Sequence, residues 1–565
     1  MRHRGLLFLS FSWVAAAGLQ AAEPSAPPKL AVVISVDQMR ADYLERFRPY
    51  FGTDGFNRLT GQGAWFQDCH YQHAVTKTAP GHATILSGVH ANVHGIIANE
   101  WLDRTTFIQG NNVEDPASPL VGLPPRLDRY ANAAFAAKAG RSPRNFLGVT
   151  VGDRLKEKYG AAAKVFGVAD KDRAAILMSG PRADSAYWTE EGRFVTSTYY
   201  RPDLPAWLEQ FNVERGAARH FGQVWDRLLE AAIYDRVQGP DEAPGETVED
   251  GLPGTFPKKV DGGKEKLTNA FFDAFDHAPW DNDLVADLAE RLVEHEQLGA
   301  DATPDLLCVG FSQTDKVGHA YGPDSHEVMD SYLRLDRTLA GFFHFLDAKV
   351  GPGNWVVALT ADHGAPSLPE KTQREQGSDA AGRLSGSALD RFLFSALDTI
   401  YGPLPENAYW ALRDNSGYHL NPAALKAKHL TGPQLDEKIR EVLLAYPTIA
   451  AVYTREQLVA PGPLDVFGEM ERLSYYAPRS MDVVYIPKRN FIERATAGTT
   501  HGTPYDYDTH VPQVWYGAGV PPGVHRERVA VEDLAPTLAA LLGVTLPPEA
   551  KGKRLFPSAT SNVQH

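Results

Sequence analysis

Cysteine is scarce in this chain. Its 565 residues include two cysteines, Cys69 and Cys308, and no Cys-x-x-Cys pair. Two thiols form at most one disulfide, so the fold cannot depend on a disulfide framework, and their spacing excludes a paired-cysteine metal site. The sequence leaves open whether these two residues form a disulfide with each other or lie buried as free thiols.

Long apolar runs and basic runs are also missing. After residue 22, no stretch approaches the roughly 20 apolar residues that a membrane-spanning helix needs. The formal net charge is −14, and no segment is dense in lysine and arginine. Without a basic tract to neutralise phosphates, the chain is poorly suited to nucleic acid, so we expect no such partner. We expect the mature chain to be a monomer.

The first 22 residues have the three-part pattern of a secretory signal peptide. Arg2 and Arg4 form a short basic start, residues 6–19 are apolar or small, and Ala22 closes a pair of alanines. The pattern predicts cleavage after Ala22 and a mature chain of residues 23–565, which is secreted and, in a cell with two membranes, periplasmic. An uncleaved membrane anchor is the alternative, but the apolar run is short for a bilayer span.

Short apolar runs recur along the chain, and amphipathic helical patterns separate them. The runs predict buried strands at residues 30–36, 165–168, 306–312, 355–360 and 513–516. The helical patterns lie at 283–295, 324–350 and 531–542, and Asp324 with Glu327 predicts a capping box at the start of the second.

This alternation predicts an α/β fold with a doubly wound, mostly parallel sheet that is flanked by helices on both faces. Two stretches lack the alternation, at about 174–280 and 366–499. We expect both to be insertions that cap a single catalytic domain spanning residues 23–565. In such sheets, ligands bind beyond the carboxyl ends of the strands.

Acidic and histidine side chains follow three of the predicted strands. Asp37 ends the first, Asp315 and His319 follow the third at a spacing that places both on one helix face, and Asp362 and His363 follow the fourth. Each motif alone is as well explained by a polar turn or by chance. Because three strands end in this way, we interpret the five side chains as ligands of a metal centre.

A sixth ligand is expected from the segment GTTHGTPYDYDTHVPQ, which contains His501 and His510. One of them would bind metal, and the local sequence does not decide which. Three aspartates and three histidines fit two zinc ions, because zinc accepts imidazole nitrogen and carboxylate oxygen and its catalytic sites keep positions open for substrate. Bound cations would also reverse the local charge for an anionic substrate, despite the negative net charge.

The segment T-K-T-A-P-G-H supplies a candidate nucleophile, Thr78. A helical pattern follows it, so its hydroxyl would lie in the positive potential of a helix N-terminus, beside free backbone N–H groups. A metal ion would lower the pKa of this hydroxyl and activate it. The alternative is that Thr78 only caps the helix.

Together, Asp37, the segment T-K-T-A-P-G-H, Asn99, the D-x-x-x-H and D-H-G motifs and the late His-Gly pair resemble the alkaline phosphatase superfamily. The resemblance is closest to its threonine-nucleophile branch, which includes nucleotide pyrophosphatase/phosphodiesterases and PafA-like bacterial alkaline phosphatases. The motifs occur in the family's order between residue 31 and about residue 545.

The resemblance implies two zinc sites and divides the ligands between them. One site would consist of Asp315, His319 and His501, and the other of Asp37, Asp362 and His363, with Thr78 bridging towards both. His501 is preferred to His510 because the family's ligand is the histidine of a His-Gly pair.

The resemblance also implies that Asn99 contacts a phosphoryl oxygen, and that the K-x-R pair Lys171 and Arg173 marks the monoesterases of the branch. A monoester dianion has one more charged terminal oxygen than a diester. An arginine that binds two phosphate oxygens and a mobile lysine can together pair with that charge. The alternative for the K-x-R pair is a solvated charged turn.

The function predicted from these residues is that of an exported two-zinc alkaline phosphatase that hydrolyses phosphate monoesters through a phosphothreonine intermediate. A phosphodiesterase on the same scaffold is the nearest alternative. A sulfatase is disfavoured, because the segment at Thr78 holds neither an oxidisable cysteine or serine nor an arginine. A non-catalytic periplasmic protein would bind metal or phosphate without turnover.

Overall fold

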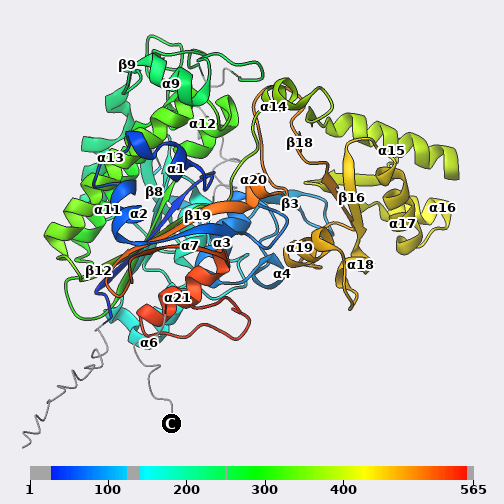
Figure 1. Ribbon diagram of the computed structural model, residues 1–565. Helices are drawn as coiled ribbons and strands as arrows, with labels where there is room; N and C mark the ends of the chain where they lie inside the picture. Colours follow the sequence, from blue (N-terminus) through cyan, green and yellow to red (C-terminus); the bar gives the residue numbers. More distant parts are fainter. Residues whose placement is uncertain (1–26, 124–139, 248–250, 557–565) are drawn as a thin grey trace, which may run out of the picture.

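The computed structural model describes residues 27–123, 140–247 and 251–556 (Figure 1). The predicted signal peptide at 1–22 lies outside the described residues. Within them, no helix combines the length and the apolar character needed to cross a bilayer.

A ten-stranded sheet lies at the centre of the molecule, in the order β20–β2–β19–β12–β1–β11–β6–β7–β8–β5. Its strands are β1 (Leu30–Val36), β2 (Ala64–His70), β5 (Leu120–Val121), β6 (Val165–Ala169), β7 (Ser185–Glu190), β8 (Arg193–Ser197), β11 (Asp305–Phe311), β12 (Trp355–Thr360), β19 (His510–Gly517) and β20 (Gly523–Ala530). The middle strands β12, β1, β11, β6 and β7 are parallel. Strand β19 is antiparallel to both of its neighbours, and β8 is antiparallel to β7 and β5.

The α/β architecture predicted from the sequence is confirmed, although the sheet is more mixed than expected. All five predicted strands are present, and the last is longer than its apolar run because β19 begins at His510. Every residue of β1, β11 and β12 is buried. Burial on both faces is the reason why these strands are uniformly apolar instead of alternating.

Helices cover the two faces of the sheet (Figure 1). On one side, α13 (His326–Lys349) packs against α2 (Phe56–Gln62), α11 (Trp280–His295) and α12 (Gln313–Tyr321). On the other side, α3 (Thr78–Ser87) packs against α6 (Val151–Tyr159), α7 (Asp172–Ser179) and α21 (Leu534–Leu541). The short elements that connect them include α1 (Tyr43–Arg46), α4 (Ala91–His94), β3 (Glu100–Leu102), β4 (Gln109–Asn111) and α20 (Asp506–Thr509).

The start of α13 differs from the predicted capping box. The helix begins at His326, and its N-cap is Ser325, whose hydroxyl accepts a hydrogen bond from the Val328 N–H. Asp324 forms ion pairs with Arg46 and Lys371 instead. Its carboxylate is therefore used to join separate segments, and a serine satisfies the helix end.

The stretch 174–280 is not wholly outside the central sheet. Strands β7 and β8 come from it and extend the sheet. The remainder forms short elements: α8 (Ala206–Arg215), β9 (Gln223–Trp225), α9 (Ala231–Gln238), β10 (Lys258–Val260) and α10 (Asn269–Asp276). Most residues of β7 and β8 are buried, yet both strands mix polar with apolar side chains, so neither period-2 alternation nor an apolar run marks them in the sequence.

The stretch 366–499 contains a small sheet with its own hydrophobic core, which appears as the lobe on the right of Figure 1. The antiparallel order is β14 (Ala411–Asp414), β15 (Gly417–Leu420), β17 (Val483–Pro487) and β16 (Ile449–Thr454). The other elements are α14 (Pro369–Gln376), β13 (Gly382–Arg383), α15 (Gly386–Tyr401), α16 (Pro422–Lys428), α17 (Gly432–Leu444), α18 (Arg455–Val459), α19 (Val466–Ser474) and β18 (Phe491–Ile492). We call residues 366–499 the cap.

Gly167 allows α7 to lie close to strand β6. A Cβ atom at this position would lie 2.2 Å from the carbonyl oxygen of Ala175, which is backbone and cannot rotate away. The close approach fixes the height of α7 above the sheet, and with it the positions of its N-cap Lys171 and of Arg173 in its first turn.

We expect Gly167→Ala to destabilise the protein by about 1–3 kcal/mol, the usual cost of overpacking, because α7 must move outward. Denaturant unfolding would measure this loss. Gly61→Ala is the matched control, because a Cβ atom there meets nothing within 4 Å. Equal stability of the two variants would contradict the close-packing argument.

Candidate active site

Predicted site residues meet at the carboxyl ends of the parallel strands. Asp37 follows β1, Asp315 lies four residues after β11, and Asp362 lies two residues after β12. Lys171 follows β6, next to β11 in the sheet. Because these strands are parallel neighbours, their carboxyl ends lie at one edge of the sheet, where ligands bind in such folds.

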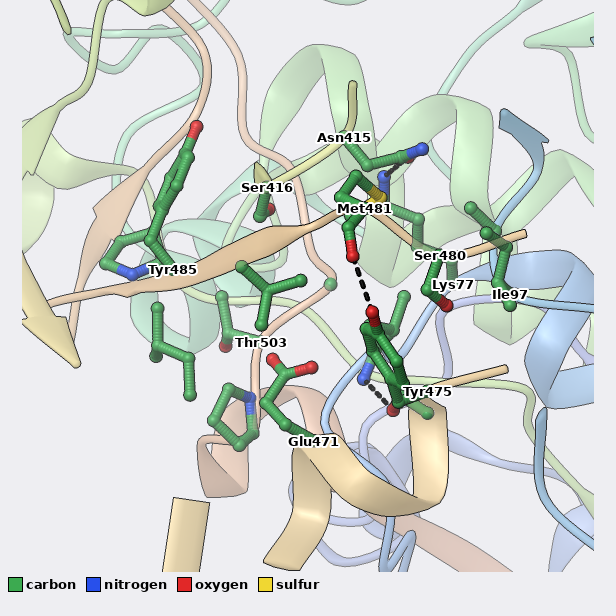
Figure 2. Close-up of a pocket in the computed structure, with 18 residues that line it drawn as sticks. Lys77, Ile97, Asn415, Ser416, Glu471, Tyr475, Ser480, Met481, Tyr485 and Thr503 are labelled. Atoms are coloured by element: carbon green, nitrogen blue, oxygen red, sulfur yellow. Dashed lines mark hydrogen bonds between the residues drawn. The ribbon is translucent and has the colours of Figure 1, made fainter. Parts of the chain in front are cut away.

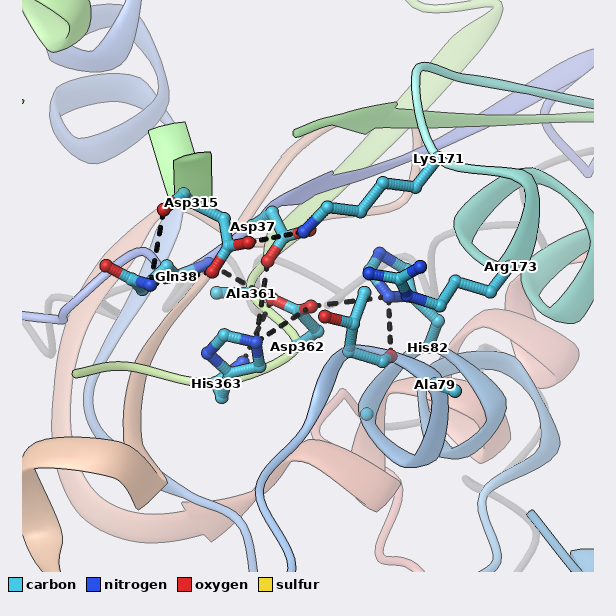
Figure 3. A network of polar contacts seen from close by, with 12 residues as sticks. Asp37, Gln38, Ala79, His82, Lys171, Arg173, Asp315, Ala361, Asp362 and His363 are labelled. Carbon is cyan, nitrogen blue, oxygen red and sulfur yellow. Dashed lines mark hydrogen bonds and ion pairs between the residues drawn. The ribbon is translucent and has the colours of Figure 1, made fainter. Parts of the chain in front are cut away.

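Asp37, Asp362 and His363 form one group. Their potential ligand atoms all lie within 4.8 Å of one another. His363 Nε2 is 3.4 Å from Asp37 Oδ1 and 3.3 Å from Asp362 Oδ2. These three atoms are buried and have no hydrogen-bond partner among the described residues. Figure 3 shows them facing a common point.

Asp315, His319 and His501 form the second group. Asp315 Oδ1 is 3.2 Å from His319 Nε2 and 3.7 Å from His501 Nε2. His363 connects the two groups, because its ligand atom lies within 4.8 Å of those of Asp315 and His501. All six predicted aspartate and histidine ligands are therefore adjacent in space.

Backbone carbonyl groups orient the three histidines. The Nδ1 atoms of His319, His363 and His501 contact the carbonyl oxygens of Thr499, Gly364 and Thr76 at 2.8, 2.9 and 2.7 Å, respectively. A carbonyl oxygen can only accept, so each Nδ1 carries a proton, and in a neutral ring Nε2 then keeps its lone pair. Although burial opposes it, Asp315 raises the pKa of His319 above its ordinary value. Burial lowers the pKa of His363 to about 3 and that of His501 well below its ordinary value. Neutral rings with a free Nε2 are what metal coordination requires.

His510 lies in a different place from His501. Its ring stacks on that of His70, and the two form a separate group with Asp68. His501, and not His510, therefore lies in the group with Asp315 and His363. Cys69 and Cys308 are both free and buried, so they do not form a disulfide with each other.

Thr78 is the first residue of α3 and is buried. The first turn of α3 packs directly on Asp362, since a Cβ atom at Gly81 would lie 2.3 Å from the Asp362 carbonyl oxygen. Asn99 Oδ1 accepts a hydrogen bond of 2.8 Å from the Ala79 N–H. Because that oxygen is engaged, the amide nitrogen of Asn99 is the group that can donate to a ligand beside Thr78.

Lys171, the N-cap of α7, and Arg173 in its first turn approach the carboxylates (Figure 3). Lys171 Nζ is 2.7 Å from Asp37 Oδ2 and 2.5 Å from Asp315 Oδ2. Burial alone would lower the pKa of Lys171, but Asp315 and Asp37 raise it above its ordinary value, so the amine is charged. Arg173 Nε is buried and has no hydrogen-bond partner among the described residues, which leaves it able to bind an anion.

Two further residues of the site were not predicted from the sequence. Gln38 donates its backbone N–H to Asp362 and its Nε2 to Asp315, at 3.1 and 2.6 Å, and so connects the two groups. His82 Nδ1 lies 2.8 Å from the Thr78 carbonyl oxygen and 3.4 Å from Asp362 Oδ2. His82 was visible in the motif T-K-T-A-P-G-H, whereas Gln38 had no signal beyond its place after Asp37.

The model of the type I phosphodiesterase / nucleotide pyrophosphatase family matches residues 31–511. This chain belongs to that family. Its relatives include the alkaline phosphatase PhoV of Synechococcus elongatus, 31% identical over 94% of this chain and 92% of that protein. The alkaline phosphatase PafA of Elizabethkingia meningoseptica is 31% identical over 93% of each chain.

The family likeness extends to the whole three-dimensional structure. The crystal structure of wild-type alkaline phosphatase PafA superposes with a TM-score of 0.84 at 30% identity, and the match covers 94% of this chain and 99% of that one. The match includes most of the cap as well as the central sheet. The resemblance inferred from scattered motifs is therefore confirmed at the level of the family and the fold.

A narrow cavity lies between the cap and the segments that flank Thr78 and His501 (Figure 2). It has about 30 Å³ of space for solvent, which suits about one water molecule rather than a substrate. Glu471 lines it beside Tyr475, Tyr485 and Lys77, whose Nζ donates to Asn415 Oδ1 at 2.7 Å. Burial raises the pKa of the Glu471 carboxyl to about 8.

This pKa predicts a loss of stability with rising pH. Stability from protonated Glu471 is fully present below its ordinary pKa of 4.5 and is lost as the pH rises through about 8. Glu471→Gln removes this dependence, so we expect the variant to gain stability relative to wild type between about pH 5 and about pH 9. Denaturant midpoints at both values measure the change. If the difference in midpoint between Glu471→Gln and wild type were the same at both pH values, the raised pKa of Glu471 would be contradicted.

Proposed function

We propose that this protein is an alkaline phosphatase that hydrolyses phosphate monoesters, with Thr78 as the nucleophile and two zinc ions as cofactors. The observation that carries the proposal is the joint placement of two cations, Lys171 and Arg173, beside a nucleophile at a helix N-terminus and six potential metal ligands. Full-length relatives named alkaline phosphatases support it.

The residues fit two zinc ions. The unpartnered buried atoms Asp37 Oδ1, Asp362 Oδ2 and His363 Nε2 face one another, an arrangement that costs free energy unless a cation or proton lies between them. The donor set mixes imidazole nitrogen with carboxylate oxygen, which suits zinc better than calcium or magnesium. We propose that Asp315, His319 and His501 would hold one ion and Asp37, Asp362 and His363 the other, with Thr78 directed towards both. Zinc bound there would lower the pKa of the threonine hydroxyl and stabilise charge on the leaving oxygen.

The chain's own residues account for binding and orientation. Arg173 and Lys171 pair with the terminal phosphoryl oxygens, and the Asn99 amide donates to a third, so the phosphorus lies in front of Thr78. The Thr78 oxygen forms the new bond to phosphorus while the ester oxygen departs. Water then attacks the phosphorus of the phosphothreonine, the bond to the Thr78 oxygen breaks, inorganic phosphate leaves, and Thr78 regains its proton. A crystal structure also exists of a PafA variant in which a threonine, an asparagine, a lysine and an arginine are substituted together. These are the residue types of Thr78, Asn99, Lys171 and Arg173.

A phosphodiesterase is the second candidate, because the family's name includes that activity. Lys171 and Arg173 favour the monoester. Two cations match the extra charged oxygen of a monoester dianion, whereas a diester needs room for a second ester group. We further propose that residues 1–22 direct export to the periplasm, that the mature chain is a monomer, and that the cap shapes the entrance to the site.

Thr78→Ala should abolish turnover of an aryl phosphate monoester, with a loss of more than about 10³-fold, because the alanine side chain has no oxygen to attack phosphorus. Elemental analysis should still find two zinc ions per chain in the variant. Turnover within tenfold of wild type, with zinc retained, would remove Thr78 as the nucleophile.

The double variant Lys171→Ala/Arg173→Ala should lose monoester kcat/KM by about 10²–10³-fold or more, since each positioned donor contributes that much. Hydrolysis of a bis-aryl phosphate should fall far less. The ratio of the two rates in each protein is the measurement. If kcat/KM fell equally for both substrates, Lys171 and Arg173 would maintain the structure of the site and would not recognise the monoester.

A further inference from the structure

A second group of carboxylates lies outside the proposed zinc centre. Asp170 follows strand β6, Asp276 ends α10, and Asp281 lies in the first turn of α11. Potential ligand atoms of the three side chains all lie within 4.8 Å of one another. Lys316 of α12 reaches the same place, with its Nζ 2.7 Å from Asp170 Oδ2 and 2.9 Å from Asp276 Oδ2.

The charges in this group do not balance. Three carboxylates surround one ammonium group, and the ammonium forms its ion pairs with Asp170 and Asp276. Asp281 is fully buried, and neither of its oxygens has a hydrogen-bond partner among the described residues. An unpaired buried carboxylate is costly, so Asp281 requires either a bound proton or a further cation.

The geometry favours a cation. Burial raises the pKa of Asp281 well above its ordinary value and that of Asp276 to about 7, so the group holds negative charge poorly unless a positive ion is present. A divalent ion would neutralise the two charges that Lys316 leaves. The donor atoms are all oxygens, which selects hard cations such as Ca²⁺ or Mg²⁺ over zinc. Asp276 is one third exposed, which gives an ion a route of entry.

We propose that Asp170, Asp276 and Asp281 bind a hard divalent cation, Ca²⁺ or Mg²⁺, at a site separate from the zinc centre. Water completes the coordination, as is usual for both ions. Thr189 donates its hydroxyl to Asp170 Oδ1 and orients that carboxylate towards the group.

The position of this site gives the ion a structural role. Asp170 is the neighbour of Lys171, and Lys316 is the neighbour of Asp315. An ion that joins these segments to the turn between α10 and α11 would hold the end of β6 and the start of α12 in place. The proposal does not depend on the phosphatase assignment, because it concerns ion binding and stability.

Terbium luminescence is the sharpest test, because Tb³⁺ replaces Ca²⁺ at oxygen sites and is excited through nearby tryptophan. Trp280 precedes Asp281, and Trp188 precedes Thr189, so the site has two sequence neighbours able to sensitise the ion. With the zinc centre filled, we expect Tb³⁺ emission that Ca²⁺ or Mg²⁺ displaces. Competition by each ion identifies which of them the site prefers.

The variant Asp281→Asn distinguishes a bound cation from a shared proton. Asparagine has the shape of a protonated aspartate, so a proton-only cluster would tolerate the change. We expect the variant to lose Tb³⁺ affinity by at least about tenfold and to lose the rise in thermal midpoint that Ca²⁺ or Mg²⁺ causes in wild type. Zinc content should stay unchanged.

Asp287→Asn is the matched control, since Asp287 lies on the same helix but pairs with Arg215 at the surface. It should behave as wild type in both measurements. Equal Tb³⁺ emission and equal midpoints for wild type and Asp281→Asn would overturn the proposal and leave a shared proton in the cluster.

Discussion

Repulsion between buried carboxylates is the constraint on which the site depends. Asp37, Asp315 and Asp362 meet at one edge of the sheet, each almost fully removed from water. Such a concentration of negative charge is stable only where positive charge lies close by. Lys171 pairs with Asp315 and Asp37, and the unpartnered atoms of Asp362 and His363 face the space beside them. The residues around the site hold these carboxylates and the Lys171 ammonium group in fixed positions.

The scaffold achieves this with very short connections. Each acid follows a parallel strand within a few residues, so the rigid sheet fixes its position and no long loop is needed. Gly81 and Gly167 let α3 and α7 lie directly on the backbone of neighbouring segments. Gln38 then joins Asp315 to Asp362, so the two halves of the candidate metal centre share one hydrogen-bonded link. The link consists of the Gln38 backbone N–H on one side and the Gln38 side chain on the other.

Local pattern was sufficient for part of this arrangement. The apolar runs of β1, β11 and β12 are uniform because both faces are buried, and the polar residues that follow them stand out. Because the strands were expected to be parallel, their order along the chain was enough to predict that Asp37, Asp315 and Asp362 lie close together. The start of α13 was misread because Asp324 and Ser325 are both good N-caps, and ion pairs with remote residues decide between them.

Other features could not be read from the sequence because they arise between distant segments. The role of Gln38 depends on three loops that meet, and the cluster at Asp281 joins the end of β6 to α10, α11 and α12. The cap sheet was missed because its strands are short and come from separated parts of residues 366–499. Strands β7 and β8 mix polar and apolar residues although most of them are buried, so neither an alternating pattern nor an apolar run marks them.

The candidate ligands come from both ends of the chain, and this has a consequence for biosynthesis. Asp37 lies after the first strand, whereas His501 comes just before β19, which inserts between β2 and β12. A ribosome releases Asp37 and Thr78 long before it reaches His501. The centre therefore cannot close on a nascent polypeptide, and translation must be nearly complete before all six ligands can meet.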